Sequence, residues 1–147
     1  MERYDKVIDL GLPSGRLWAV ENVPDPHGIE EAKERFGNRI PSAKAWDELR
    51  ILCKWRWKWH FNRGKRGYLV TGPNGNSIFL PVLGFVTEFG ALANKSGYGY
   101  YWSRPTFQAG LAQYVLFGGG SQPSKDEFFQ FTTQTIKLSV RLCQEPE

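Results

Sequence analysis

The residues with the clearest chemical character lie at 53–67, which read CKWRWKWHFNRGKRG. Three tryptophans alternate there with lysine and arginine, and residues 54–66 hold six basic side chains and no acidic one. The net charge of +4 at pH 7 therefore comes from this one segment. Basic residues interleaved with aromatic ones are typical of surfaces that bind nucleic acid, because the cations attract phosphate and the rings stack on bases.

The alternation itself favours a different interpretation. One parity holds Trp55, Trp57, Trp59 and Phe61, and the other holds Lys54, Arg56, Lys58 and His60. On a β-strand, residues of opposite parity point to opposite faces. We therefore predict an amphipathic strand whose tryptophans face the core and whose basic side chains are solvated. Binding of nucleic acid or of an anionic glycan through the basic face is the alternative, and a membrane-active segment is disfavoured.

Groups that could support catalysis or hold a metal are sparse. The chain has two histidines, His27 in PDPHG and His60 in the basic segment, and neither lies near a nucleophile motif. Gln122, Asp126 and Glu127 offer oxygen ligands for calcium, but the strand expected after them supplies no matching acidic partner. We therefore expect no enzymatic activity, no catalytic residues, no cofactor and no metal.

Length and composition indicate one globular domain over residues 1–147. The chain has 147 residues, of which 41% are hydrophobic and 23% charged. The longest apolar run, 78–86, is interrupted by Pro81 and Gly84 and is too short to span a membrane. The first twelve residues carry charges where a signal peptide would have a continuous apolar core, so we expect no export signal.

Hydrophobic spacing predicts two helices in the first third of the chain. Apolar residues recur at helical spacing over 29–36, and Gly37 follows as a stop signal. Ser42 is a suitable N-cap for a second helix that runs to about residue 53. The rest of the chain is typical of strands and turns, so the predicted fold class is α+β.

The strand predictions begin with a meander. Strands are expected over 54–61, 68–71 and 77–80, joined by NRGKRG and by GPNGN, whose Asn-Gly pair is a strong hairpin signal. Further strands are expected over 98–103, 112–117 and 135–142. The last one alternates cleanly, with Ile136, Leu138, Val140 and Leu142 on one face and Thr135, Lys137, Ser139 and Arg141 on the other.

Five segments together resemble the Fibrobacter succinogenes major paralogous domain family, which is common in gut Bacteroidetes. In order they read VIDLGLPSGRLWAVENV, AKERFGNRIPSAKAWDELRILCKWRW, GYLVTGPNGNSIFLPVLGF, YYWS and SVRL, and they cover nearly the whole chain. The resemblance implies a C-type lectin-like fold: two helices packed on small twisted antiparallel sheets with long loops, and N- and C-terminal strands near each other. It supplies no catalytic residues.

The same resemblance implies a non-enzymatic recognition module at a cell surface, a pilus tip or a phage particle. Its partner would be a protein or a glycan bound through the C-terminal half, where lectin-like domains of this kind are targets of diversity-generating retroelements. An extracellular or cell-surface location is therefore expected, with a phage-associated or cytoplasmic one as the alternative. The competing function is a structural or nucleic-acid-associated module that uses the basic strand 54–66.

Composition places the candidate binding surface beside the glycine-bearing connection after residue 103. The stretch concentrates tyrosine, arginine and amide side chains, which give large contact area at low entropic cost. The candidate residues are Tyr98, Tyr100, Ser103, Arg104, Thr106, Phe107, Gln108 and Gln113. The tyrosines are equally suited to the core of a small β-rich domain, so both interpretations stay open for them.

The two cysteines, Cys53 and Cys143, form the candidate disulfide. They would lie on the second helix and the last strand, positions that C-type lectin-like folds often join. Cys143 follows the polar set of the last strand, so this strand would have to end or bulge before Cys143 for the thiol to reach a buried helix. The alternative is a buried free thiol at Cys53.

Overall fold

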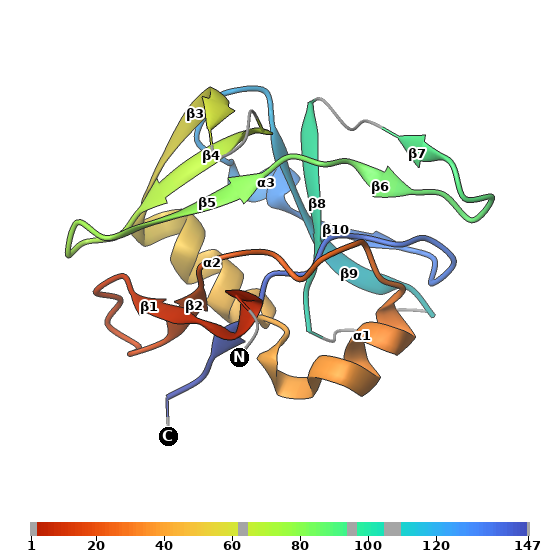
Figure 1. Cartoon of the computed structure of the whole chain (residues 1–147), viewed down its shortest axis with the longest axis horizontal. Helices are drawn as coiled ribbons and strands as arrows, with labels where there is room; N and C mark the ends of the chain where they lie inside the picture. Colours follow the sequence, from red (N-terminus) through yellow and green to blue (C-terminus); the bar gives the residue numbers. More distant parts are fainter. Residues whose placement is uncertain (1–2, 62–64, 94–96, 105–109, 147) are drawn as a thin grey trace.

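The computed structural model describes residues 3–61, 65–93, 97–104 and 110–146, without the side chains of His60 and Phe61. The fold is α+β, with few helices and several small antiparallel sheets, as the sequence predicts (Figure 1). In the described part of the chain no helix is long and apolar enough to cross a bilayer.

Both predicted helices are confirmed. Helix α1 spans Ile29–Phe36, and Gly37 follows it with a φ of 53°, which favours glycine. Helix α2 spans Ala43–Leu52, and the Ser42 side chain caps it by accepting a hydrogen bond from the Ala45 amide at 3.1 Å. The remaining helical elements are short: η1 (Arg3–Asp5), η2 (Gly37–Arg39) and α3 (Lys125–Phe128).

The described strands form four antiparallel sheets. The N-terminal sheet has the order β1 (Val7–Asp9), β2 (Leu17–Ala19), β11 (Cys143–Gln144). The predicted meander is confirmed as β3 (Lys54–Phe61), β4 (Lys65–Thr71), β5 (Ser77–Pro81). The third sheet has the order β10 (Phe129–Thr132), β9 (Ala112–Gly118), β8 (Tyr98–Trp102), and the fourth pairs β6 (Phe85–Val86) with β7 (Leu92–Ala93). Because β11 pairs with β2, the two ends of the fold are neighbours, as expected.

Two apolar clusters lie on opposite sides of the β8–β9 pair. Tyr101 and Val115 are directly paired and belong to the first cluster, which also contains residues of α2 and of β3–β5. Trp102 belongs to the second cluster, together with Ile29 and Phe36 of α1. Strands β8 and β9 therefore have few solvent-facing positions, because alternating residues enter one cluster or the other.

The predicted burial of the β3 tryptophans is right at one end of the strand and wrong at the other. Trp55 is 5% exposed and packs against the rings of Tyr68, Phe117 and Phe128. Trp57 is partly buried, whereas Trp59 is 63% exposed. The first apolar cluster covers the start of β3, but the far end of this strand extends beyond the cluster.

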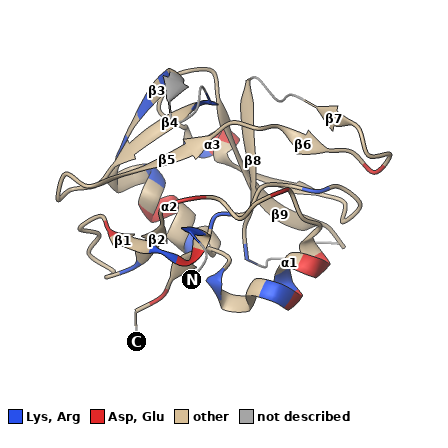
Figure 2. Ribbon diagram, in the orientation of Figure 1, with Lys and Arg blue, Asp and Glu red and all other residues tan. Residues whose placement is uncertain are grey.

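The opposite face of β3 is basic, as predicted. Lys54 and Arg56 are exposed, and Lys58 is half-buried. Figure 2 shows the lysine and arginine positions along β3, and residues 54–66 contain no acid.

The strand predicted over 135–142 is only partly formed. Regular pairing is confined to β11 at 143–144, while three isolated bridges join Lys137 to Val86, Leu138 to His27 and Ser139 to Tyr101. Its predicted polar face is also wrong. Ser139 is 6% and Arg141 1% exposed, because this segment lies between residues 19–27 on one side and β8 on the other.

Both cysteines are free and buried in the structure. Cys53 is the C-cap residue of α2, and Cys143 lies in β11. Burial raises the pKa of the Cys53 thiol to about 11 and that of the Cys143 thiol to about 12. This arrangement corresponds to the free-thiol alternative.

Candidate functional site

Of the predicted surface residues that the structure describes, Tyr100, Ser103 and Gln113 are buried. Thr106, Phe107 and Gln108 lie outside the described residues. Tyr100 is 9% exposed, and its ring lies between those of Phe85 (4.8 Å between centroids) and Tyr114 (5.8 Å). The core interpretation of Tyr100 is therefore the correct one.

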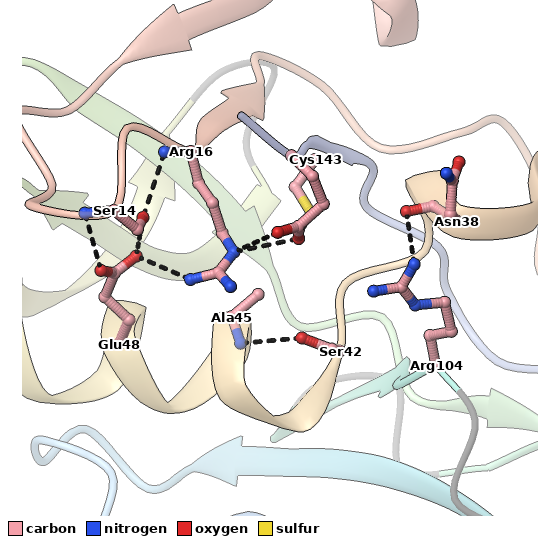
Figure 3. Close-up of polar contacts among 9 residues, drawn as sticks. Ser14, Arg16, Asn38, Ser42, Ala45, Glu48, Arg104 and Cys143 are labelled. Atoms are coloured by element: carbon pink, nitrogen blue, oxygen red, sulfur yellow. Dashed lines mark hydrogen bonds and ion pairs between the residues drawn. The ribbon is translucent and has the colours of Figure 1, made fainter. Parts of the chain in front are cut away.

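Three further candidates contact neighbouring parts of the protein. Ser103 and Gln113 are 1% and 8% exposed, and the Ser103 hydroxyl lies 3.4 Å from the Gln113 amide oxygen. Arg104 donates from its backbone amide to the Pro41 carbonyl at 2.7 Å and from its guanidinium to the Asn38 carbonyl at 3.2 Å (Figure 3). The burial of Ser103 and Gln113 indicates a structural role for this pair. The two hydrogen bonds of Arg104 connect the end of β8 to the segment between α1 and α2.

Figure 3 also shows a polar cluster near the chain ends. Arg16 contacts the Glu145 carboxylate at 2.8 Å and the Glu48 carboxylate at 3.4 Å, and the Ser14 hydroxyl donates to Glu48 at 2.7 Å. The Cys143 thiol lies 3.8 Å from the Glu145 carboxylate. These contacts connect β2, α2 and the C-terminal segment, and the raised thiol pKa disfavours a nucleophilic role for Cys143.

Tyr98 is the one described candidate with an exposed side chain, at 44%. It begins β8, pairs with Gly118 of β9 and follows Gly97. Gly97 lines a pocket of about 300 Å³, which we call the tryptophan pocket. The pocket-lining residues are Trp57, Trp59, Arg66, Gly97, Gly119 and Gly120.

The strand register places the aromatic walls of the tryptophan pocket. Trp57 pairs with Tyr68 across β3 and β4, and the rings of Trp57 and Trp59 meet edge to face at 5.5 Å and 87°. Between Lys58 and Phe61 the register shifts, which is the irregularity expected of a β-bulge. The two indoles thus form a corner at the end of the hairpin.

On the opposite side of the pocket, the described lining residues are glycines. Gly119 and Gly120 have φ angles of 78° and 87°, which side chains rarely adopt. The Tyr68 hydroxyl holds this turn: it accepts from the Gly120 amide at 3.1 Å and lies 2.8 Å from the Ser121 carbonyl. A Cβ at Gly120 would lie 3.9 Å from Trp57 Cγ, whereas one at Gly97 would have nothing within 4 Å.

Among the lining residues that the structure describes, Arg66 is the charged one. Its Cζ lies 5.5 Å from the centre of the Trp59 ring, in cation–π geometry. Within the described residues, the buried Nε1 atom of Trp57 has no hydrogen-bond partner. The pocket therefore combines apolar aromatic walls with a cation at its edge.

A second hollow, the Arg141 cleft, has a volume of about 320 Å³. It is lined by Val20, Glu21, Asn22, Val23, Pro24, Asp25, Lys65, Phe79, Pro81, Leu83 and Arg141. Arg141 donates to the Asn22 side chain at 2.7 Å, to the Ala19 carbonyl at 3.0 Å and to the Phe79 carbonyl. Burial lowers its pKa to about 10. These bonds use the guanidinium to connect three segments of the fold.

Possible ligands for a metal are dispersed. Across the described residues, no group of three or more histidine, cysteine, aspartate or glutamate side chains could hold a metal ion. His27 is 6% exposed, with Nδ1 at 2.8 Å from the Asp25 carbonyl and Nε2 at 2.9 Å from Arg35. Both ring nitrogens of His27 thus have partners within the fold.

Comparison with protein-family models, curated proteins and solved structures gives no match in any of the three. The structure itself therefore carries the argument for a site.

The sequence reasoning missed the tryptophan pocket because its walls come from separate segments. The alternation of β3 predicted that Trp57 and Trp59 face the core, and composition placed the binding surface on other residues. One available clue was the position of Trp59 at the far end of a strand, next to a turn rich in glycine and basic residues.

Proposed function

We propose that the chain is a non-enzymatic recognition domain with a C-type lectin-like fold, which binds a protein or glycan ligand at the tryptophan pocket. The observation that carries the proposal is the 63% exposure of Trp59 beside a second indole. Tryptophan is, with tyrosine and arginine, enriched among the residues that carry most of the binding energy at interfaces. The pocket also uses Gly97, Gly119 and Gly120 from the C-terminal half.

The pairing of the N- and C-terminal strands and the two helices beside small sheets support the lectin-like part of the proposal. A location at a cell surface, a pilus tip or a phage particle follows from the same resemblance. A neighbouring reverse transcriptase gene and a near-copy of the 3′ end of the gene would support membership of a diversity-generating system.

The test compares two exposed aromatic residues. The wild-type chain is screened against immobilised glycans and against bacterial cell surfaces, and Trp59→Ala and Phe89→Ala are measured on each ligand found. Phe89 is the matched control, because it is 89% exposed but lies outside the pocket lining. We expect Trp59→Ala to weaken binding about tenfold or more with an unchanged Tm, and Phe89→Ala to retain it. Equal binding by all three proteins contradicts the proposal.

A nucleic-acid-associated function is the second candidate. It is favoured by the exposed Lys54 and Arg56 on the outer face of β3. Binding through several phosphates would lose affinity steeply with salt, in proportion to the number of phosphates contacted. Titration of a single-stranded oligonucleotide at two salt concentrations tests it.

A further inference from the structure

We infer that the tryptophan pocket receives one saccharide ring that carries an anionic group, either a carboxylate or a sulfate. This ligand class rests on the proposed function, because it concerns the same pocket. Pocket size, the arrangement of the indoles and the Arg66 guanidinium each favour it.

The size of the tryptophan pocket limits its occupant to a small group. Its volume of about 300 Å³ lies at the lower end of the range for small-molecule sites. The three glycines add no side chains to the lining, so the space beside Trp57 is left for a ligand. One six-membered ring fits such a volume better than a folded peptide segment.

The two indoles suit a ring with apolar C–H edges. Trp57 and Trp59 stand at 87° to each other, with ring centroids 5.5 Å apart. The face of an aromatic ring carries partial negative charge, and sugar C–H groups carry partial positive charge. A pyranose can therefore pack its C–H face on one indole while its hydroxyl groups stay in water.

The cation selects an acidic sugar. Arg66 lies 5.5 Å from the Trp59 ring, and none of the described lining residues is an acid. The planar guanidinium matches the geometry of carboxylate and sulfate, which it binds with paired, charge-assisted hydrogen bonds. An apolar peptide side chain would fill the same space but would offer the guanidinium no hydrogen-bond acceptor.

Strand geometry disfavours nucleic acid at the tryptophan pocket. Lys54 and Arg56 have the opposite parity to Trp57 and Trp59, so they point away from the face where a base would stack. An oligonucleotide stacked on the indoles would place its successive phosphates out of reach of those two cations. The described lining of the pocket therefore offers one cation, whereas nucleic-acid binding draws on several.

The experiment titrates the chain, by calorimetry and tryptophan fluorescence, with four probes: a galacturonic acid trimer, a sulfated galactose trimer, a neutral galactose trimer and an oligothymidine of eight nucleotides. We expect the acidic trimers to bind at least about tenfold more tightly than the neutral one. The tighter of the two acidic trimers identifies the anionic group. A single ionic contact predicts that affinity falls only about two- to threefold between 50 and 200 mM salt.

Four variants assign the effect to residues. Trp59→Ala should weaken the acidic trimers about tenfold or more, and Arg66→Gln should bring acidic and neutral trimers to similar affinity. Gly97→Leu should block the pocket without disturbing the fold, since a Cβ there meets nothing within 4 Å. Lys54→Gln removes a cation from the opposite face and should change every affinity by less than about twofold.

The possible failures are distinguishable. Equal binding of acidic and neutral trimers, unchanged in Arg66→Gln, overturns the acidic ligand class but supports a recognition pocket. The same conclusion follows if no saccharide binds but a protein ligand does, and Trp59→Ala loses the binding of that protein. Preferred binding of the oligothymidine, weakened by Lys54→Gln, overturns both proposals. So does a chain whose ligands are all unaffected by Trp59→Ala and Gly97→Leu.

Discussion

In sequence, apolar and polar residues alternate equally regularly in strand β3 and in the C-terminal segment 135–142. The two regions differ in which residue departs from the burial that this alternation predicts. In β3 the last tryptophan of the apolar parity, Trp59, is 63% exposed. In the C-terminal segment the last residue of the polar parity, Arg141, is 1% exposed. The far end of β3 is not covered by the core, whereas the C-terminal segment is buried on both faces from residue 138 to residue 142.

This difference shows what residue parity reports. Alternation decides which residues share a face, but the burial of that face depends on which elements pack against it. Trp59 lies beyond the cluster that covers Trp55, so its indole faces a pocket. Arg141 lies among segments that supply carbonyl and amide oxygens, so its charge is held inside.

The largest expected effect sharpens the comparison within β3. Trp55→Ala removes a 5% exposed indole and should lower the free energy of unfolding by about 3 to 5 kcal/mol. Trp59→Ala should lower it by less than about 1 kcal/mol, because its indole is mostly solvated. Urea denaturation measures both values. Similar losses for the two variants would mean that the ends of β3 are equally covered.

A slightly smaller effect is expected in the C-terminal segment. Arg141→Met leaves the Ala19 and Phe79 carbonyls and the Asn22 side chain without their donor, and should cost about 2 to 4 kcal/mol. Lys137→Met is the control of the same parity; Lys137 is exposed, and its replacement should cost less than about 0.5 kcal/mol. If urea denaturation shows equal losses of unfolding free energy for the two variants, Arg141 does not act as a cross-link.

Alkaline pH should weaken the fold through the two thiols. Burial raises the pKa of Cys53 to about 11 and of Cys143 to about 12, so the folded state favours the protonated form. The stabilisation that results from this preference is complete below about pH 9, the ordinary thiol pKa. It declines above that pH, because the thiols of the unfolded chain then release protons. Burial lowers the Arg141 pKa to about 10, which acts in the opposite direction above that value.

The decline should therefore be clearest between about pH 9 and 10, measured as the urea midpoint. A double Cys53→Ala and Cys143→Ala variant is the control and should show a flatter profile over this interval. An equally steep decline in that variant would assign it to other groups.

The smallest expected effect concerns Cys53 and Cys143, whose disulfide would connect the two compared regions. Cys53 precedes β3 and Cys143 follows the C-terminal segment, and both are free in the structure. Thiol titration in denaturant without reductant should find two thiols per chain. In the folded protein at pH 8 both should react slowly, because the thiolate form is disfavoured. Absence of free thiols in the denatured chain would indicate the disulfide.

The sequence predicted the elements better than their surroundings. The helix ends at Gly37 and Ser42 and the hairpin at GPNGN follow from local backbone preferences, which neighbouring residues determine. The tryptophan pocket and the burial of Tyr100 depend on contacts between segments far apart in the chain. Residue types alone suited Tyr100 to a surface as well as to a core, and only packing distinguishes the two.

The enclosed C-terminal segment also has a kinetic consequence. Arg141 reaches the Ala19 carbonyl, 122 residues away, and β11 completes the sheet begun by β1 and β2. Contacts of such long sequence separation form slowly, because much chain entropy is lost before they are made. During synthesis, the N-terminal sheet would wait for residues 141–144 to leave the ribosome, with Trp18 and Ala19 lacking part of their final cover until then. The domain is therefore expected to complete its fold late in synthesis. Until then its uncovered apolar residues are accessible to chaperones.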